Sequence, residues 1–143
     1  MVVSASPTTR PADAAGPVPR ALVVENDLTS RELLARVLRL KGLDAHTAIG
    51  AAQAAALLLD APTPYDLLIV DLDLEPTDGV ELLRQIAALP LARRPRQFVA
   101  ISQSLAAFYP RLSELRLPLE TFQKPVHLPT LMKVVEALSG TNP

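Results

Sequence analysis

Short apolar runs alternate with amphipathic segments along most of the chain. The runs have the lengths of buried strands and lie at 21–24, 43–48, 67–70, 98–101 and 121–123. The segments between and after them repeat apolar residues at helical spacing, within 33–38, 50–61, 80–87, 104–116 and 131–138. Strict alternation of this kind favours right-handed βαβ units. It therefore predicts an α/β domain, a doubly wound (βα)5 sandwich around a parallel five-stranded sheet.

Glycine and proline mark where the predicted helices begin and end. Gly42 is expected to stop the first helix, and Pro129 suits the first turn of the last one. The segment 104–116 is the least regular, because Pro110 is expected to break or kink any helix there.

Length and composition limit the class of protein. The chain has 143 residues, 49% of them hydrophobic, which is enough for one domain with a core. A net charge of -1 argues against nucleic acid as the main partner. The absence of cysteine excludes disulfides and thiol chemistry, and no apolar stretch approaches the roughly 20 residues that a membrane span needs. A cytoplasmic domain, without a membrane partner, is therefore expected.

The ends of the chain differ from its middle. Residues 1–20 contain four prolines and no long apolar run, which predicts a flexible tail. The folded domain is expected to span 21–139, followed by a short tail at 140–143. No further domain is expected, so any output should pass through contacts with a protein target.

Polar residues follow the predicted strands at the points where ligands bind in open α/β sheets, the carboxyl ends. They are Glu25, Asn26, Asp27, Asp71, Ser102 and Lys124. In the strand order 2-1-3-4-5, carboxylates from the first and third strands would meet beside a hydroxyl and an ammonium. Hard oxygen donors of this kind suit Mg²⁺. A carboxylate beside a cation, a hydroxyl and a lysine is equipped to accept a phosphoryl group.

The sequence resembles a response-regulator receiver domain of the CheY-like superfamily. The matching pieces are LVVEND, YDLLIVDLDLEPTDGVELL, VAIS and FQKP, in that order. The resemblance implies a flavodoxin-like fold and a phosphoacceptor at Asp71, which would receive its phosphoryl group from a histidine kinase or phosphotransfer protein. It also implies that Ser102 and Lys124 assist that transfer and the later dephosphorylation, with Lys124 commonly joined to Pro125 by a cis bond.

The same resemblance implies a Mg²⁺ site. Its ligands would be Glu25, Asn26, Asp71 and the backbone carbonyl of Asp73. Asn26 stands where the family usually has a carboxylate, so we expect weakened Mg²⁺ binding, with Asp27 or Asp73 as neighbours that could compensate.

Two further departures concern the switch. Gln103 follows Ser102 where a small residue is usual, and Thr121 replaces the usual aromatic. The main hypothesis is a stand-alone bacterial signalling domain, a monomer or weak homodimer. The alternative is a pseudo-receiver that binds its protein partner without phosphorylation.

A third hypothesis is a phosphatase, because Asp71-Leu72-Asp73 resembles the nucleophile motif of haloacid-dehalogenase-like enzymes. Only 72 residues follow Asp71, and the threonine expected soon after it is Glu75, which argues against this class.

Other residues have simpler interpretations. Glu25 and Asn26 could cap the first helix, and the Asp73 side chain is expected to be exposed. The two histidines, His46 and His127, are expected to have structural or surface roles. Phe108 and Tyr109 are expected to pack rather than to recognise a ligand.

Overall fold

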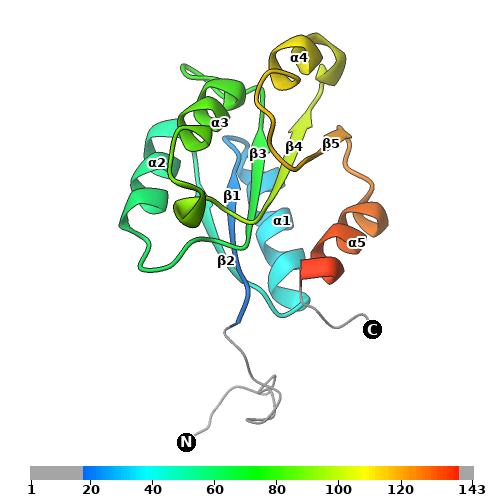
Figure 1. The fold of residues 1–143 in the computed structure, drawn as a ribbon. Coiled ribbons are helices and arrows are strands. Elements are labelled where there is room, and N and C mark those ends of the chain that lie inside the picture. Colours follow the sequence, from blue (N-terminus) through cyan, green and yellow to red (C-terminus); the bar gives the residue numbers. More distant parts are fainter. Residues whose placement is uncertain (1–17, 139–143) are drawn as a thin grey trace, which may run out of the picture.

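A parallel sheet flanked by helices forms the centre of the molecule (Figure 1). The computed structural model describes residues 18–138. Its five strands lie in the order β2-β1-β3-β4-β5, as the sequence predicted. They are β1 (Arg20–Val24), β2 (Asp44–Ala48), β3 (Leu67–Asp71), β4 (Gln97–Ser102) and β5 (Leu119–Gln123). The predicted tails lie outside the described residues, apart from 18–20.

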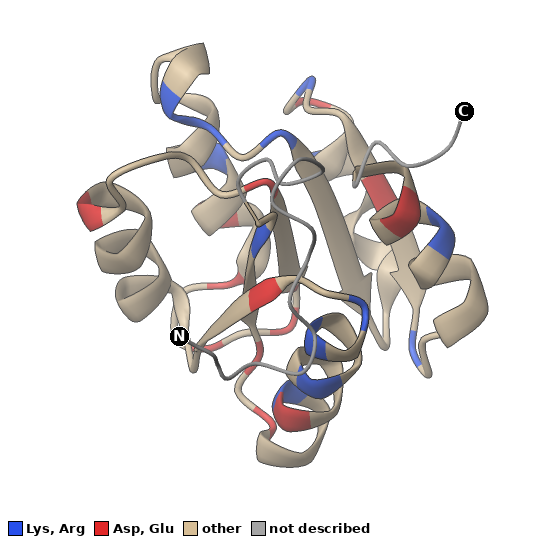
Figure 2. Ribbon diagram, turned by 90° about the horizontal axis from the view of Figure 1, so that it is seen from below, with Lys and Arg blue, Asp and Glu red and all other residues tan. Residues whose placement is uncertain are grey.

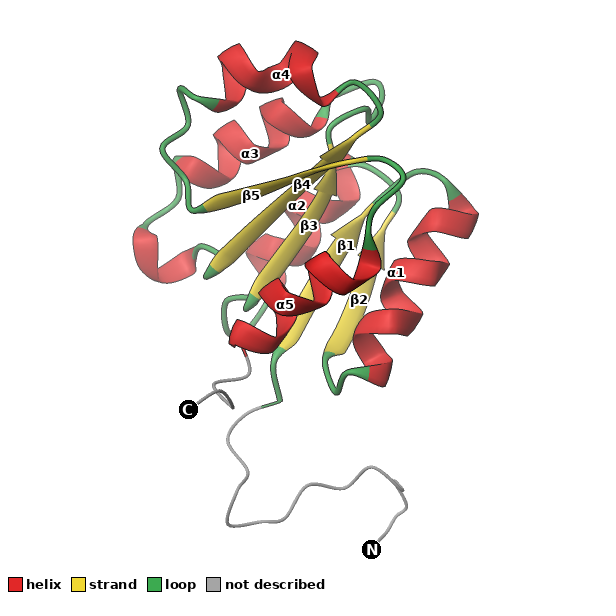
Figure 3. Ribbon diagram, turned by 90° about the vertical axis from the view of Figure 1, so that its right-hand side faces the viewer, coloured by secondary structure: helices red, strands yellow, loops and turns green. Residues whose placement is uncertain are grey.

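The helices form two layers, one on each face of the sheet (Figure 3). α1 and α5 cover one face, and α2, α3 and α4 cover the other. Their bounds are α1 (Leu28–Leu40), α2 (Ala51–Asp60), α3 (Gly79–Ala87), α4 (Leu105–Leu112) and α5 (Leu128–Leu138), with a 3-10 turn, η2, at Leu91–Arg93.

The central strands are apolar on both sides because both faces of the sheet are covered. In β3, Leu67 and Ile69 face the core under α1 and α5, whereas Leu68 and Val70 face the other core. All four side chains are fully buried. The run 67–70 is continuously apolar because its residues contribute to both cores. The parallel register also brings the carboxyl ends of β1, β3 and β4 to one edge of the sheet.

Side-chain caps fix where the helices near that edge begin. The Asp27 carboxylate accepts a hydrogen bond from the Ser30 backbone N–H at the start of α1. The Asp78 carboxylate does the same for Glu81 at the start of α3. At the other end of α1, Gly42 has φ +92°, which ends the helix at little conformational cost.

The sequence predicted that Pro110 would break or kink a helix in 104–116, and the helix is not broken there. Pro110 lies inside α4, which continues to Leu112. Proline removes one hydrogen-bond donor, and the carbonyl four residues earlier belongs to Ala106, an exposed residue that water can serve. The buried residues Leu105 and Leu112 hold the two ends of the helix on the core.

Charges of both signs are distributed over the same helices and loops (Figure 2). Within residues 18–138, no helix is long and apolar enough to cross a bilayer.

Candidate functional site

Four side chains meet at the carboxyl edge of the sheet, each from a different strand end. Asp71 ends β3, Ser102 ends β4, Glu25 follows β1 and Lys124 follows β5. The first three are almost fully buried, at 2%, 0% and 0% exposure. The sequence prediction that these strand ends converge is therefore correct in geometry.

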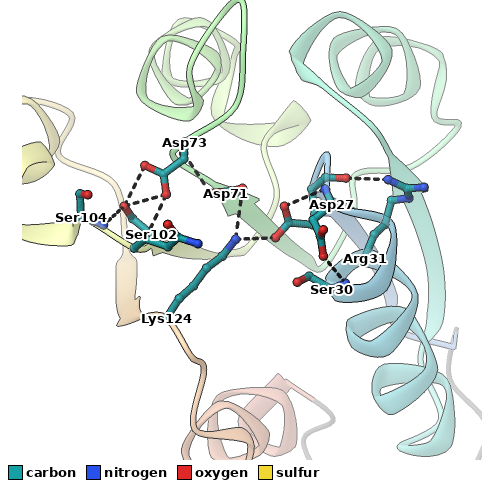
Figure 4. Close-up of polar contacts among 10 residues, drawn as sticks. Asp27, Ser30, Arg31, Asp71, Asp73, Ser102, Ser104 and Lys124 are labelled. Atoms are coloured by element: carbon teal, nitrogen blue, oxygen red, sulfur yellow. Dashed lines mark hydrogen bonds and ion pairs between the residues drawn. The ribbon is translucent and has the colours of Figure 1, made fainter.

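A lysine joins the two buried carboxylates. Lys124 Nζ lies 2.9 Å from Glu25 Oε1 and 3.3 Å from Asp71 Oδ2 (Figure 4). Backbone N–H groups satisfy the other oxygens, because Asp27 donates to Glu25 Oε2 and Asp73 donates to Asp71 Oδ1. The two acids are thus oriented by the chain itself, with one ammonium shared between them.

The shared burial has opposite consequences for the two kinds of group. Burial, followed by the neighbouring Glu25 carboxyl, raises the pKa of Asp71 above its ordinary value of 3.8. Burial alone would lower the pKa of Lys124, but the contacts with Glu25 and Asp71 outweigh it and raise that pKa above 10.5. Lys124 is therefore charged at neutral pH.

Close packing brings α3 against the end of β3. A Cβ built on Gly79 would lie 2.6 Å from the Asp71 carbonyl oxygen and 2.8 Å from Leu72 Cα. Only glycine fits there without displacing backbone. Asp78 caps α3, and Gly79 therefore lets the start of α3 pack closely against the end of β3.

The residues after β1 do not all face the cluster. Asn26 is exposed, and Asp27, also exposed, caps α1. The N-cap of α1 is therefore Asp27, and not Glu25 or Asn26 as the sequence suggested. The hydrogen bond from the Ser30 backbone lowers the pKa of Asp27, so this carboxylate is ionised and committed to the helix. Arg31 of the same helix donates to the Glu25 carbonyl at 3.0 Å.

Asp73 is placed differently from expectation. Its carboxylate is half-buried and accepts the Ser102 hydroxyl, at 3.2 Å to Oδ1 and 3.1 Å to Oδ2. It also accepts the Gln103 backbone N–H at 3.0 Å. The Asp73 side chain points away from Lys124, and its carboxylate connects the loop after β3 to the loop after β4 (Figure 4). The prediction of an exposed side chain was wrong.

The loop after β4 is held on its other side by β5. The Gln123 side chain accepts the Leu105 N–H at 3.3 Å and donates to the Gln103 carbonyl. Ser104 N–H donates to the Ser102 hydroxyl at 2.8 Å. Nothing in the sequence pattern singled out Gln123, since its role depends on the ladder that pairs it with Ser102.

A second ion pair ties α4 to the start of α3. The two terminal guanidinium nitrogens of Arg111 donate to the Asp78 carboxylate, at 2.8 and 3.1 Å. This bidentate contact, followed by the backbone hydrogen bond from Glu81, lowers the pKa of Asp78 against the opposing effect of burial. Phe108 is half-buried and packs on the core, as predicted, whereas Tyr109 is 49% exposed.

The remaining predicted residues lie apart from the cluster. Thr121 on β5 is half-buried and pairs with Ala100. His46 contacts Tyr65 and Asp44 near the opposite end of the sheet, and the exposed His127 contacts Thr130. These contacts agree with structural or surface roles for both histidines.

An open cavity of about 510 Å³ leads to the cluster. Glu25, Gln103 and Lys124 form its polar end, and α1 and the start of α5 contribute apolar side chains. The Lys124-Pro125 bond beside it is cis, as is Glu75-Pro76. A reactant could therefore reach Lys124 from solvent although Asp71 and Glu25 are buried.

Fold and site together define an α/β domain with a buried acidic pocket at the carboxyl ends of its strands. The family model described as the response regulator receiver domain matches residues 21–136. The chain belongs to this family, as the sequence indicated, and the receiver fold is a signalling module of two-component systems.

Solved structures agree with this assignment. A response regulator receiver protein from Pseudomonas putida is 28% identical, with a TM-score of 0.75 over 86% of this chain and 99% of that one. A CheY-like receiver domain from Methylobacillus flagellatus is 25% identical, with a TM-score of 0.73 over 85% and 98%. A response regulator from Thermotoga maritima in complex with Mg²⁺-BeF is 22% identical, with a TM-score of 0.70 over 84% and 98%. No curated protein matches the chain.

Proposed function

We propose that Asp71 accepts a phosphoryl group from a histidine kinase or phosphotransfer protein, and that the phosphorylated domain signals through a changed affinity for a protein target. One observation carries the proposal. A buried carboxylate at the end of β3 lies 3.3 Å from the ammonium of Lys124, and the Ser102 hydroxyl ends the neighbouring strand. A carboxylate beside an ammonium and a hydroxyl is equipped to accept a phosphoryl group.

The transfer would proceed at Asp71 with balanced bonds. A carboxylate oxygen attacks the phosphorus of a phosphohistidine, the new O–P bond forms, and the N–P bond breaks. The electron pair of the broken bond goes to the imidazole, which takes up a proton from solvent. Lys124 is already positioned to offset charge on the phosphoryl oxygens, because its ammonium lies beside the attacking carboxylate.

The donor set also fits Mg²⁺, although weakly. Mg²⁺ is usually held by one or two carboxylates with several waters retained. Glu25 and Asp71 supply two, and we propose Asn26 and the Asp73 carbonyl as further ligands. Among residues 18–138, no three His, Cys, Asp or Glu side chains are grouped to hold a metal. Bound Mg²⁺ would supply positive charge to the phosphoryl oxygens.

The proposal places the domain in the cytoplasm, where it binds a downstream protein target and neither nucleic acid nor a membrane. The oligomeric state that we propose is a monomer or weak homodimer. The rearranged segment would be the loop after β4 and the adjoining face of α4 and β5, because Ser102 and Gln103 lie there.

A second candidate is a phosphorylation-independent binding module. The observation in its favour is that Asp73 already occupies the Ser102 hydroxyl and the Gln103 N–H. A loop held without phosphate is what a constitutive partner would recognise.

Phosphorylation by acetyl phosphate, with and without Mg²⁺, separates the two candidates. We expect a shift on a phosphate-affinity gel that requires Mg²⁺ and is absent in Asp71→Asn. The absence of a shift at high Mg²⁺ would refute the phosphoacceptor proposal and favour the binding module. Asn26→Asp then tests the metal site, because a restored carboxylate should lower the Mg²⁺ concentration needed for the shift.

A further inference from the structure

The loop after β4 carries two donors that face an anion supplied by the chain itself. The Ser102 hydroxyl and the Gln103 N–H both donate to the Asp73 carboxylate, at 3.1 and 3.0 Å to the same Oδ2 atom. Asp73 is two residues from Asp71. A phosphoryl group on Asp71 would bring three acceptor oxygens into the same region.

We propose that Asp73 is a positioning residue, an internal carboxylate that competes with the phosphoryl group for the Ser102 hydroxyl and the Gln103 N–H. The inference rests on the proposed phosphorylation of Asp71. In the unphosphorylated domain, Asp73 holds the loop after β4 in place. Phosphorylation would release Asp73, and the freed donors would turn to the phosphoryl oxygens.

The donor inventory makes this competition stringent. A serine hydroxyl has one proton and a backbone amide has one, so each can be given fully to one acceptor. The Ser102 hydroxyl is fully buried and also accepts the Ser104 N–H at 2.8 Å, which limits how it can turn. Asp73 and a phosphoryl oxygen therefore cannot both be fully bonded to these two donors.

Gln123 connects the same loop to β5 and α4. It donates to the Gln103 carbonyl and accepts from Leu105, the first residue of α4. A shift of Gln103 away from Asp73 would thus be felt at the start of α4. The route needs no aromatic side chain, and Thr121 occupies the position where such a side chain would be expected.

The test compares Asp73→Ala, Asp73→Asn and wild type in two measurements. The first is hydrogen exchange of the Gln103 amide by NMR, without a phosphodonor. The second is the rate of phosphorylation by acetyl phosphate with Mg²⁺, in which the Asp71 O–P bond forms and acetate leaves. Glu75→Gln is the matched control, because it removes one negative charge from an exposed position of the same loop.

We expect the Gln103 amide to exchange about tenfold faster in Asp73→Ala, because a charge-assisted hydrogen bond is lost. Phosphorylation should become about five- to tenfold faster, since the donors are free from the start. Asp73→Asn should lie between wild type and Asp73→Ala, because its amide oxygen still accepts. Glu75→Gln should match wild type in both measurements.

The outcomes separate the competition from the proposed function. Equal phosphorylation of wild type and Asp73→Ala, or an unchanged Gln103 amide, would overturn the competition alone. Equal acceleration by Asp73→Asn and Asp73→Ala would also overturn it, since that result indicates simple charge repulsion. No phosphorylation of any variant at saturating Mg²⁺ would refute the proposed function and the competition with it.

Discussion

Replacement of Lys124 by methionine isolates the contribution of the shared ammonium. Lys124→Met keeps much of the apolar stem and removes the only cation that the structure places on Glu25 and Asp71 among the described side chains. Those two carboxylate side chains are 1% and 3% exposed, so they have little access to water when the lysine is lost. We expect the variant to be strongly destabilised.

The magnitude follows from the two contacts. At 2.9 and 3.3 Å and an effective dielectric of about 20, each contact gives about 5 kcal/mol of gross attraction. The cost of removing the lysine from water offsets much of this, because its side chain is only 17% exposed. Removing one partner of a buried pair leaves a net loss of about 3 kcal/mol. In thermal unfolding this corresponds to a melting temperature about 10 °C lower.

The loss should depend on pH in a defined direction. The pKa of Asp71 is already raised by burial and by Glu25, and loss of Lys124 raises it further. A carboxyl whose folded-state pKa is raised stabilises the fold in its protonated form, and this contribution is lost as the pH rises above 3.8 through the folded-state pKa. The deficit of Lys124→Met should therefore be larger at pH 8 than at pH 5.

Urea unfolding in EDTA measures this deficit, with Lys41→Met as the control. Lys41 also contacts a carboxylate, Glu136 at 3.6 Å, but the two side chains are 46% and 59% exposed. Its loss should cost no more than about 0.5 kcal/mol. A Lys124→Met protein within 1 kcal/mol of wild type, or a deficit equal at both pH values, would refute the reasoning.

Three other expectations follow from contacts elsewhere in the domain. A double-mutant cycle of Asp78→Asn and Arg111→Gln in urea unfolding should give a coupling of about 1 kcal/mol, and near zero would contradict the bidentate pair. Because the pKa of Asp78 is lowered, its contribution should persist above pH 3.8 and disappear as the pH falls through the folded-state value. Gly79→Ala should cost about 2 kcal/mol by overpacking, whereas Gly50→Ala, with no atom within 4 Å, should cost less than about 1 kcal/mol. Burial raises the pKa of Tyr65, so its phenolate absorbance should develop above pH 10.0. The absorbance of Tyr65 is obtained as the difference between wild type and Tyr65→Phe. Development at or below that pH would contradict the burial argument.

The fold could be predicted in advance because its signals are local. The apolar run 67–70 predicts a buried strand because it is short, contains β-branched residues and ends at polar residues, and Gly42 marks the end of a helix by its backbone freedom. The weakest predictions concerned elements that depend on neighbours. Pro110 is tolerated in α4 because Ala106, whose carbonyl would accept the missing hydrogen bond, is exposed to water. The spacing of residues in the sequence does not reveal that exposure.

The candidate site divides in the same way. Asp71, Ser102 and Lys124 could be placed because each lies at the carboxyl end of a strand, and parallel strands have these ends at one edge of the sheet. The direction of the Asp73 side chain could not, because a loop between a strand and a helix has no fixed side-chain period. Its partners are 29 and 30 residues away in sequence. Gln123 was missed for the same reason, since it becomes visible only when the β4–β5 register is known.

The placement of the acids around Asp71 argues against Asp73 as a replacement for the carboxylate absent at Asn26. The Asp73 side chain contacts Ser102 and Gln103, whereas Lys124 contacts Glu25 and Asp71. A carboxylate that accepts those two hydrogen bonds is not free to act as a direct ligand of a cation beside Glu25. Asp27 is equally committed, because it caps α1. We therefore expect metal affinity and loop position to depend on different residues in this domain. Asn26→Asp should therefore change the Mg²⁺ concentration that phosphorylation needs without altering hydrogen exchange of the Gln103 amide. Asp73→Ala should speed exchange of the Gln103 amide without changing that Mg²⁺ concentration.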